Sequence, residues 1–512
     1  MGLMTMDALT NLFYGFAVAI EPWNLCIALI GVVVGTAVGV LPGLGPTATV
    51  SLLLPISVSL NQTSAIILLA AIYYGAMYGG SITSILIRVP GEAASAVTSL
   101  DGYAMTKQGR AGVALGISAF GSFIAGLVAT FGIVLLGPSF ADKALAFGPI
   151  EKTGLVLFGL TLAASVGSGS KVRAWAMVGL GLLLSTVGVD LMSGEERFTF
   201  GSVNMRDGID IAVLAMGLFG VSEVLSAAER KEPVDATPIP SYGLRDLLPG
   251  RADWKASGWP IARGTTLGFL LGLLPGGGAL ISSFASYVME KKLARNPERF
   301  GRGAIEGVAG PESANNAAAQ ASFVPLLCLG IPPNAVIGVI MGALLMQGVT
   351  PGPELIVQHP DLFWGVIASM LIGNAMLLIL NIPLVRFFVM LLRVPQAYMT
   401  PCIMLFCTIG AFSINNSMFD VGVMIASGFG AYGLRKAGFD LAPLLLAFLL
   451  GSLLEQNVEQ SLIIATGDYT AFLRSPISLG FLIMAAAAVL FPIFASIARG
   501  IGRKTAAQSV QQ

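Results

Sequence analysis

The chain has 512 residues, of which 55% are hydrophobic and 11% are charged. An ordinary soluble domain carries roughly 25% charged residues, so this composition is typical of a membrane protein. The 28 basic and 28 acidic side chains cancel, which argues against a nucleic-acid-binding role because that role needs a basic surface. Long apolar runs recur along the chain, for example at 111–137 and 361–385. They predict an all-α, polytopic membrane protein with about a dozen transmembrane segments.

The first glycine motif, GVVVGTAVGVLPGLGP (31–46), places glycines four residues apart and then breaks at Pro42. Glycine at this spacing lets another helix approach closely in lipid, whereas Pro-Gly-x-Gly must interrupt the helix. An interrupted helix at mid-membrane leaves unpaired N–H and C=O groups, which must be buried in protein or face a water-filled cavity. The half-helix that begins near Pro46 and Thr47 is suited to bind a carboxylate, and the preceding carbonyls a cation. The alternative is that the motif only kinks a packed helix.

The next motif, YGGSITSILIRVPGEA (78–93), carries Ser81, Thr83 and Arg88 before a second break at Pro90 and Gly91. Arg88 either neutralises a substrate carboxylate or marks the cytoplasmic end of a helix, and we favour the second interpretation. Glu223 and Glu455 each follow an apolar run. They are candidate proton carriers if they face the interior, and solvated helix ends otherwise.

The two halves of the chain repeat these features. Residues 264–278, GTTLGFLLGLLPGGG, reproduce the first motif, and IPPNAVIGV (331–339) corresponds to VPGEAASAV (89–97). Between the halves lies a segment rich in charge and proline, which we interpret as a cytoplasmic linker because of its basic residues. We therefore divide the chain into an N-terminal segment (1–21), a first membrane repeat (22–228), the linker (229–256), a second repeat (257–475), and a C-terminal transmembrane helix with a cytoplasmic tail (476–512).

The second glycine motif lies between two basic segments, 227–258 and 290–303, so residues 259–290 must leave the cytoplasm and return to it. Either two full crossings or a re-entrant hairpin that turns at 275–278 would do this. Only about a dozen residues follow the turn, which is short for a span, and we favour the hairpin. No lysine or arginine precedes Arg88, so the first hairpin (24–60) is expected to open to the opposite side. The sequence therefore predicts inverted repeats, as in many secondary transporters.

Segment 310–335, GPESANNAAAQASFVPLLCLGIPPNA, places Asn315 and Asn316 before an apolar run. Their amides offer N–H donors to a carboxylate and oxygens to Na⁺; the alternative is hydrogen bonding between helices. The sequence contains no P-loop, zinc-ligand spacing or hydrolase elbow, and its one histidine is His359. We therefore predict that the protein is not an enzyme and has no cofactor.

These motifs resemble the TctA family, the large membrane subunits of tripartite tricarboxylate transporters. The resemblance covers most of the chain. Its motifs are GVLPGLGPTATVSLLLP (39–55), YGGSITSILIRVPGEAASAVTSLDGYAMTKQGRAG (78–112), RFTFGSVNMRDGIDIAVLAMGLFGVSEVL (197–225), GLLPGGGA (272–279) and the segment 310–355 that begins GPESANN. Arg88 departs from the family, where an uncharged Asn is more often expected, and this departure puts the preferred substrate charge in doubt.

The resemblance implies a multi-pass permease of the bacterial inner membrane that imports a small di- or tricarboxylate such as citrate, driven by a Na⁺ or proton gradient. Its implied partners are a periplasmic substrate-binding protein (TctC-like), a small membrane subunit (TctB-like) and the lipid bilayer. A carboxylate symporter that needs no binding protein is the alternative. An intramembrane enzyme is disfavoured because ionisable residues within the apolar runs are few.

Motifs and resemblance together give a set of expected substrate-binding residues. They are Pro42, Gly43, Gly45, Pro46, Thr47, Ser81, Thr83, Arg88, Pro90, Gly91, Pro275, Gly276, Gly277, Gly278, Asn315, Asn316, Pro332 and Asn334. Any Na⁺ ion is expected near Gly43, Gly276, Asn315 and Asn316.

Overall fold

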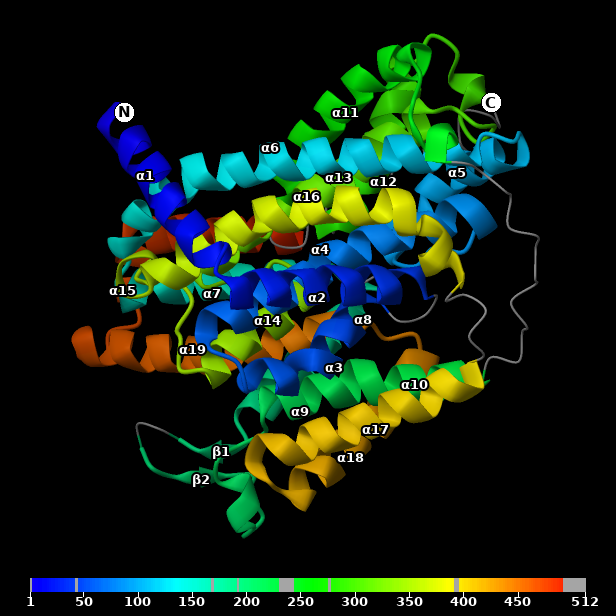
Figure 1. Ribbon diagram of the computed structural model, residues 1–512. Coiled ribbons are helices and arrows are strands. Elements are labelled where there is room, and N and C mark those ends of the chain that lie inside the picture. The colour runs from blue at the N-terminus through cyan, green and yellow to red at the C-terminus, as the bar shows by residue number, and fades with distance from the viewer. Residues whose placement is uncertain are drawn as a thin grey trace, which may run out of the picture.

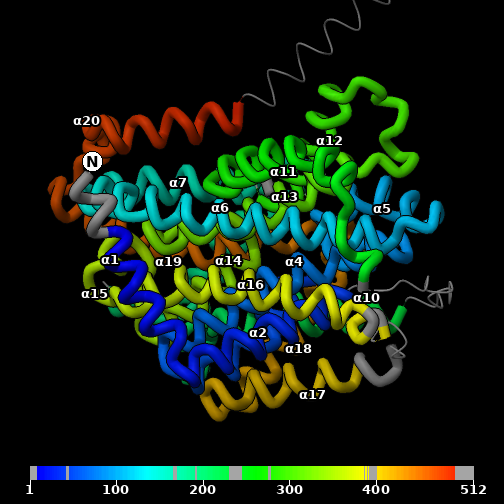
Figure 2. The backbone as a smooth tube through the Cα atoms, turned by 45° about the horizontal axis from the view of Figure 1, so that its top comes forward, coloured from blue at the N-terminus to red at the C-terminus, as the bar shows by residue number. Residues whose placement is uncertain are grey.

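The computed structural model describes residues 2–41, 45–166, 170–190, 193–229, 244–274, 278–390 and 396–490. Within these ranges the chain is almost entirely helical, which confirms the predicted all-α class. Most helices run in roughly one direction and its reverse, stacked in layers (Figure 1). A view from a different angle shows the same stack, with α17 and α18 at one outer edge and α11 and α12 at another (Figure 2).

Three helices come first in the first half, and the break of the first glycine motif lies between the second and the third of them. The elements are α1 (Gly2–Ala19), α2 (Pro22–Val40), α3 (Pro46–Val58), α4 (Gln62–Ile87), η1 (Ala93–Ala96), α5 (Thr98–Lys107), α6 (Ala111–Leu145), α7 (Pro149–Val166), α8 (Lys171–Ser185), β1 (Gly188–Val189), β2 (Glu196–Arg197), η2 (Val203–Met205), α9 (Ile211–Ala215), the π-helical turn η3 (Met216–Val221) and α10 (Ser222–Glu229).

The second half begins after the charged segment. Its elements are η4 (Leu244–Leu247), α11 (Arg251–Gly272), α12 (Gly278–Leu293), η5 (Pro297–Arg299), α13 (Glu306–Ala321), the π-helical turn η6 (Pro325–Leu329), α14 (Ala335–Met346), α15 (Leu355–Gln358), α16 (Pro360–Met390), α17 (Gln396–Asn415), α18 (Met418–Lys436), α19 (Ala442–Ile464) and α20 (Ala471–Arg474). A further apolar helix covers Pro476–Leu490.

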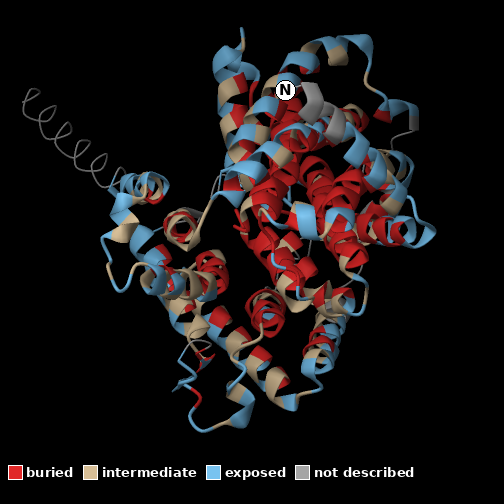
Figure 3. Cartoon of the chain, turned by 90° about the vertical axis from the view of Figure 1, so that its left-hand side faces the viewer, coloured by how far each residue is buried: buried red, intermediate tan, exposed pale blue. Residues whose placement is uncertain are grey.

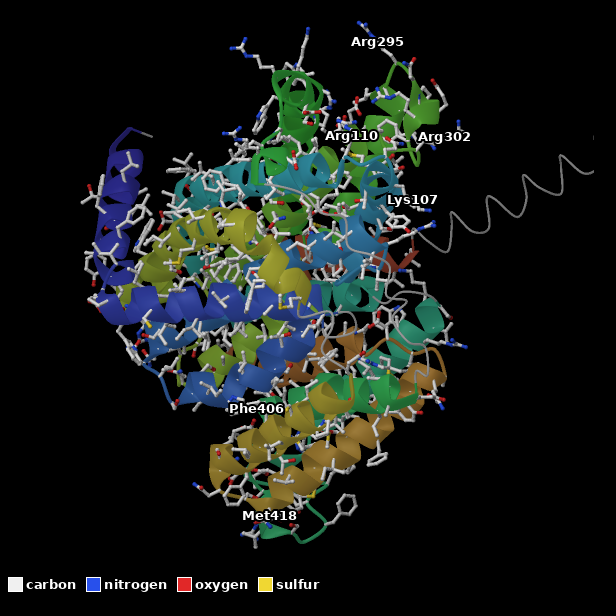
Figure 4. All side chains as sticks on the ribbon, turned by 45° about the vertical axis from the view of Figure 1, so that its right-hand side comes forward. Lys107, Arg110, Arg295, Arg302, Phe406 and Met418 are labelled. Atoms are coloured by element: carbon white, nitrogen blue, oxygen red, sulfur yellow. The ribbon has the colours of Figure 1, made fainter. Side chains whose placement is uncertain are left out.

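Five helices in the described part of the chain are long and apolar enough to cross a membrane. They are Pro22–Val40, Gln62–Ile87, Ala111–Leu145, Ile211–Glu229 and Pro360–Val385, and shorter apolar helices accompany them. Buried residues concentrate in the middle of the stack and exposed ones at its rim (Figure 3). Large exposed side chains such as Phe406 and Met418 lie on the outer helices α17 and α18 (Figure 4), as expected for a surface that faces lipid.

The glycine stripes pack two helix pairs at very short range. A Cβ atom built on Gly35 or Gly39 in α2 would lie 2.4 Å from the carbonyl oxygen of Ile72 or 2.3 Å from that of Ala76, both in α4. A Cβ atom on Gly268 in α11 would lie 2.2 Å from the carbonyl oxygen of Ala314 in α13. Only glycine permits these approaches, so the stripes position α4 and α13 against the two interrupted helices.

Both interrupted helices end where the sequence predicts. Helix α2 ends at Val40 and α3 begins at Pro46, while α11 ends at Gly272 and α12 begins at Gly278. Helix α11 begins at Arg251, so residues 251–256 of the expected linker are helical. The carboxylate of Asp253 accepts the backbone N–H of Gly250 at 3.0 Å and pairs with Arg110 at 2.8 Å, which fixes the start of this helix early.

The two ends of the helix stack differ in charge. Lys107, Arg110, Arg295 and Arg302 lie together at one end, the basic end (Figure 4). The β1–β2 hairpin and the corner at Asn61 lie at the other end (Figure 1), where Gln347 donates to the carbonyl oxygens of Ser57 and Leu60. The sequence analysis did not anticipate this hairpin, since strands of two residues leave no alternation to detect.

Candidate functional site

The most deeply buried part of the molecule is the meeting of α4 with α13. Residues 63–86 of α4 and 307–321 of α13 are all buried, although α13 carries Glu, Asn and Gln side chains. Six polar residues gather there, from α4, the break after α4, α5 and α13; we call them the central cluster. They are Ser81, Glu92, Thr98, Glu312, Asn315 and Asn316.

Glu312 lies at the centre of this cluster and is fully buried. The hydroxyls of Ser81 and Thr98 each donate a hydrogen bond to one oxygen of its carboxylate. Ser81 comes from α4 and Thr98 from the first residue of α5, so three elements converge on one side chain. Among the ion pairs of the described residues, none includes Glu312 or Glu92.

Glu92 follows the break at Pro90 and Gly91. Its carboxylate accepts the amide of Asn315 at 2.9 Å and the backbone N–H of Ala94 at 3.1 Å, and it caps the short helix η1. Gly91 brings this carboxylate inward, because it lies between Gly39 and Gly80 with no space for a side chain. The break after α4 therefore delivers a carboxylate to the buried face of α13.

Asn316 donates to Ser122 at 2.7 Å and to the backbone oxygen of Glu312 at 3.1 Å. The side-chain oxygens of Asn315 and Gln320 are buried and have no hydrogen-bond partner. A buried amide oxygen without a donor is costly, and it can bind either a donor or a cation.

Asn334 follows the second break, after Pro332, and begins α14. Its oxygen accepts the N–H of Ile337 at 3.0 Å, and its amide nitrogen lies 3.4 Å from the hydroxyl of Tyr73 in α4. The two breaks thus each place a polar side chain against the long buried helix of the other half.

Several predicted site residues lie outside the central cluster. The hydroxyl of Thr83 bonds to Gly80 in its own helix. Arg88 caps α4 in a left-handed conformation, with φ 61°, and it is exposed, as is Pro90. The substrate role of Arg88 stays a prediction, and the structure places it away from both buried carboxylates.

The predicted residues at the two glycine motifs are only partly described. Gly45, Pro46 and Thr47 form the start of α3, which packs against α4, α14 and α17. Gly278 begins α12 with φ 38°. Pro42, Gly43, Pro275, Gly276 and Gly277 lie outside the described residues, so their binding roles and the proposed Na⁺ positions beside Gly43 and Gly276 stay predictions.

Sequence reasoning missed Glu92 and Thr98 and did not assign Glu312 a role. One signal was available: Glu92 and Asn334 occupy the same position after the two corresponding proline breaks. By contrast, Glu223 and Glu455, which were considered as proton carriers, form ion pairs with Arg435 and Arg197. Neither belongs to the central cluster.

Two adjoining pockets open at the end that carries the β-hairpin. The first, the Lys152 pocket, has a volume of about 300 Å³ and is lined by Lys152, Gly330, Gln358, Gln456 and Asn457, among others. Lys152 forms no ion pair with a described residue. The pocket also contains the carboxylate residue Glu354, which accepts the amide of Gln358 at 2.8 Å, and it lies next to the break at Gly330.

The second pocket, of about 610 Å³, is acidic. Asp190, Glu455 and Glu459 lie close enough there to share one ion. However, Arg197 pairs with Glu455 and lies 3.8 Å from Asp190, and the hydrogen bond to Glu455 raises the pKa of this arginine. The guanidinium already provides the positive charge, so we assign no metal to this group.

The chain is similar in sequence to known proteins. The model of the tripartite tricarboxylate transporter TctA family matches residues 25–446. An uncharacterised 52.8 kDa protein of the TAR-I ttuC′ 3′ region of Agrobacterium vitis is 47% identical over 492 residues, covering 96% of this chain and 97% of the relative. A protein of the TAR-II ttuC′ 3′ region of the same organism is 53% identical over 230 residues, which cover 45% of this chain and 95% of the relative. No solved structure matches the chain.

The family match extends over most of the chain and includes α2 to α14, which carry both glycine stripes and the central cluster. The apolar helices described above are those of a multi-pass membrane protein. The chain is a component of a tricarboxylate transporter and belongs to the TctA family of tripartite tricarboxylate transporters.

Proposed function

We propose that this protein is the permease subunit that moves a small di- or tricarboxylate such as citrate across the bacterial inner membrane, driven by an ion gradient. A periplasmic binding protein delivers the substrate, and a small membrane subunit completes the complex. The observation that carries the proposal is the central cluster, because carboxylates and amides buried this deeply in an apolar helix stack are expensive and are typical of transport pathways.

A two-fold relation between the halves supports this assignment. Glu92, after the first break, contacts Asn315 in α13, and Asn334, after the second break, contacts Tyr73 in α4. Glu92 and Asn334 correspond in the two repeats. A two-fold axis produces reciprocal contacts of this kind, in which the residue after the break of each half contacts the buried helix of the other half. We infer that the two halves are repeats joined across the central cluster.

The ends of the helices favour an inverted arrangement of these repeats. The hairpin α2–α3 ends at the Asn61 corner, whereas α11–α12 leads into the basic loop that packs on α5 through Asp101. The Asn61 corner and the basic loop lie at opposite ends of α4. If the basic end faces the cytoplasm, as the positive-inside rule requires, the Asn61 corner faces the periplasm. The axis relating the repeats then lies in the membrane plane.

The Lys152 pocket is suited to receive the substrate on the periplasmic side. It is lined by Lys152, by the amides of Gln456 and Asn457, and by Gln358, whose amide donates to the carboxylate of Glu354 in the same lining. Ammonium and amide N–H groups are the donors that carboxylates prefer. From this pocket the break at Gly330 leads toward α13 and the central cluster, where the buried side-chain oxygen of Asn315 has no partner among the described residues.

Uptake by reconstituted protein tests the proposal. The full chain is incorporated in liposomes with the small subunit, the binding protein is added outside, and the uptake of labelled citrate is followed under an imposed ion gradient. We expect uptake that depends on the binding protein. Uptake of free citrate at the same rate without the binding protein would favour the independent symporter instead.

A pair of asparagine variants ties this uptake to the site. Asn315→Ala removes the amide that meets Glu92, and we expect it to abolish uptake. Asn415→Ala is the matched control, since Asn415 is exposed at the end of α17 and bonds only locally to Asp420 among the described contacts. Equal uptake by the two variants would exclude the central cluster as the binding site.

A further inference from the structure

The buried carboxylate of Glu312 has hydrogen-bond partners that suit both of its protonation states. A carboxylate in an apolar interior without a cation is so costly that it binds a proton or another cation instead. Glu312 is fully buried, and no described lysine, arginine or histidine pairs with it. What distinguishes it from Glu92 is the type of donor that each carboxylate faces.

Glu312 is bound by hydroxyls. The Ser81 hydroxyl has one hydrogen and two acceptors, the carboxylate of Glu312 and the backbone oxygen of Met77 at 3.2 Å. When Glu312 is charged, Ser81 donates to the carboxylate. When Glu312 gains a proton, its new O–H donates to the Ser81 oxygen, and the Ser81 hydrogen turns to Met77. Both states are therefore hydrogen-bonded, and the exchange adds or removes one proton only.

Glu92 faces a different set of donors. The backbone N–H of Ala94 can only donate, and the amide of Asn315 donates as placed. Neither donor is a hydroxyl that could reverse its hydrogen bond, so Glu92 lacks the switch that Ser81 gives to Glu312. The two carboxylates repel each other, so a charge on either one favours the protonated form of the other.

A small cavity lies beside Ser81, the hydroxyl partner of Glu312, and extends to Leu247 of η4. It has a volume of about 20 Å³ and is lined by Ser81, Ser118, Tyr78, Leu247 and Asn381, among others. A cavity of this size holds a single water molecule if polar groups bind it. The side-chain oxygen of Asn381 is buried and has no partner, so it can accept a hydrogen from such a water. A water at this position would connect Ser81 with Asn381, on the side of the cavity where Leu247 of η4 lies.

We propose that Glu312 is the proton-binding residue of the transport cycle, with Ser81 as its hydroxyl switch and the cavity beside Asn381 as its route to the cytoplasm. The inference rests on the proposed carboxylate transport and adds the identity of the coupling ion and of the residue that carries it. Each turnover then moves a proton on Glu312 together with the substrate.

The other titratable groups around Glu312 are accounted for. Tyr78 on α4 and Glu92 after the break face it directly. On α11 and α12, Arg263 and Glu290 neutralise each other in a two-point ion pair. On α5, Asp101 is held by Tyr287 and three backbone N–H groups. Glu312 is therefore the carboxylate of this region whose partners allow the exchange.

The test compares substrate exchange with gradient-driven uptake in liposomes that contain the whole complex. A gradient of one pH unit supports about tenfold accumulation for each proton carried. We expect the exchange of internal for external citrate that remains in Glu312→Gln to have lost its dependence on pH, and we expect no accumulation under a pH gradient. Glu298→Gln, at an exposed position in η5, should behave as the unaltered protein.

Ser81 provides a second and gentler variant. Ser81→Ala leaves Glu312 in place but removes the switch, so the pH of half-maximal exchange should shift, and Ser81→Thr should restore it. A merely structural role of Ser81 would change the rate at all pH values alike.

The outcomes separate the two proposals. Accumulation by the Glu312→Gln protein equal to that of the unaltered protein would overturn the role of Glu312, as would accumulation that follows a Na⁺ gradient and ignores pH. If the unaltered complex exchanges no citrate or related carboxylate at any pH, the proposed transport function fails, and the inference that rests on it fails with it.

Discussion

The glycine stripe of α11 allows a direct test of how tightly the two helices of the second half pack. Gly268→Ala would place a Cβ atom 2.2 Å from the carbonyl oxygen, 2.7 Å from the Cα and 2.8 Å from the carbonyl carbon of Ala314. Ordinary contacts are about 3.5 Å or longer, so α11 and α13 would have to separate by about 1 Å. All three atoms belong to the backbone, and no rotamer change can relieve the overlap.

Two free-energy terms of opposite sign decide the outcome. Replacing glycine by alanine within a helix stabilises it by about 0.5–1 kcal/mol, whereas overpacking costs about 1–3 kcal/mol. Gly258 lies in the same helix, is exposed, and has nothing within 4 Å of its built Cβ. We therefore expect Gly258→Ala to stabilise and Gly268→Ala to destabilise the protein. The helix term is common to both variants, so they should differ by the overpacking cost, about 1–3 kcal/mol.

The assay is equilibrium unfolding of the full chain in mixed detergent and lipid micelles, with both variants measured at one protein concentration. Equal free energies of unfolding for the two variants would refute the packing argument. A destabilised Gly258→Ala would show that the helix propensity term has been misjudged.

Three further predictions concern other parts of the molecule. In a protein whose exposed Cys26 and Cys402 are replaced by serine, Asn61→Cys and Asn296→Cys should react with a membrane-impermeant maleimide from opposite sides; reaction from the same side would contradict inverted repeats. Asp101→Ala should lower the free energy of unfolding by about 3–5 kcal/mol, because Tyr287 and the N–H groups of Gly301, Gly303 and Ala304 lose their acceptor; exposed Asp142→Ala is the control, and a matching loss there would remove the explanation. Lys152→Gln should raise the substrate concentration for half-maximal uptake about tenfold, with exposed Lys143→Gln unchanged, and an unaltered value for Lys152→Gln would exclude the Lys152 pocket.

The local features of this fold are readable from the sequence because each depends on neighbouring residues. Proline and glycine at 42–45 and 275–278 cannot continue a helix, and the helices end at Val40 and Gly272. Glycine at every fourth position predicts a close helix contact, which the Gly268–Ala314 approach provides. The pair Asn315 and Asn316 was identified because amides are conspicuous in an apolar segment.

The residues of the central cluster that were missed depend on partners far along the chain. Glu312 acquires its character from Ser81 and Thr98, which lie more than 200 positions away. Similarly, the exposure of Arg88 follows from the left-handed turn that ends α4. The π-helical turns at Met216–Val221 and Pro325–Leu329 also escaped prediction, since hydrophobic periodicity does not separate them from α-helix.

Glu92 and Asn334 occupy equivalent positions in the two repeats but differ in chemistry, and this difference makes the two halves unequal. Both follow a proline break, both cap the helix that comes next through a side-chain oxygen, and both reach the long buried helix of the other half. Only Glu92 is ionisable, and only the first break is met by a second carboxyl group, that of Glu312. A symmetric pair of neutral caps would respond equally to an ion from either side. Because both carboxyl groups lie at the first break, a cation that binds there changes the charge at this break and leaves the second break unchanged.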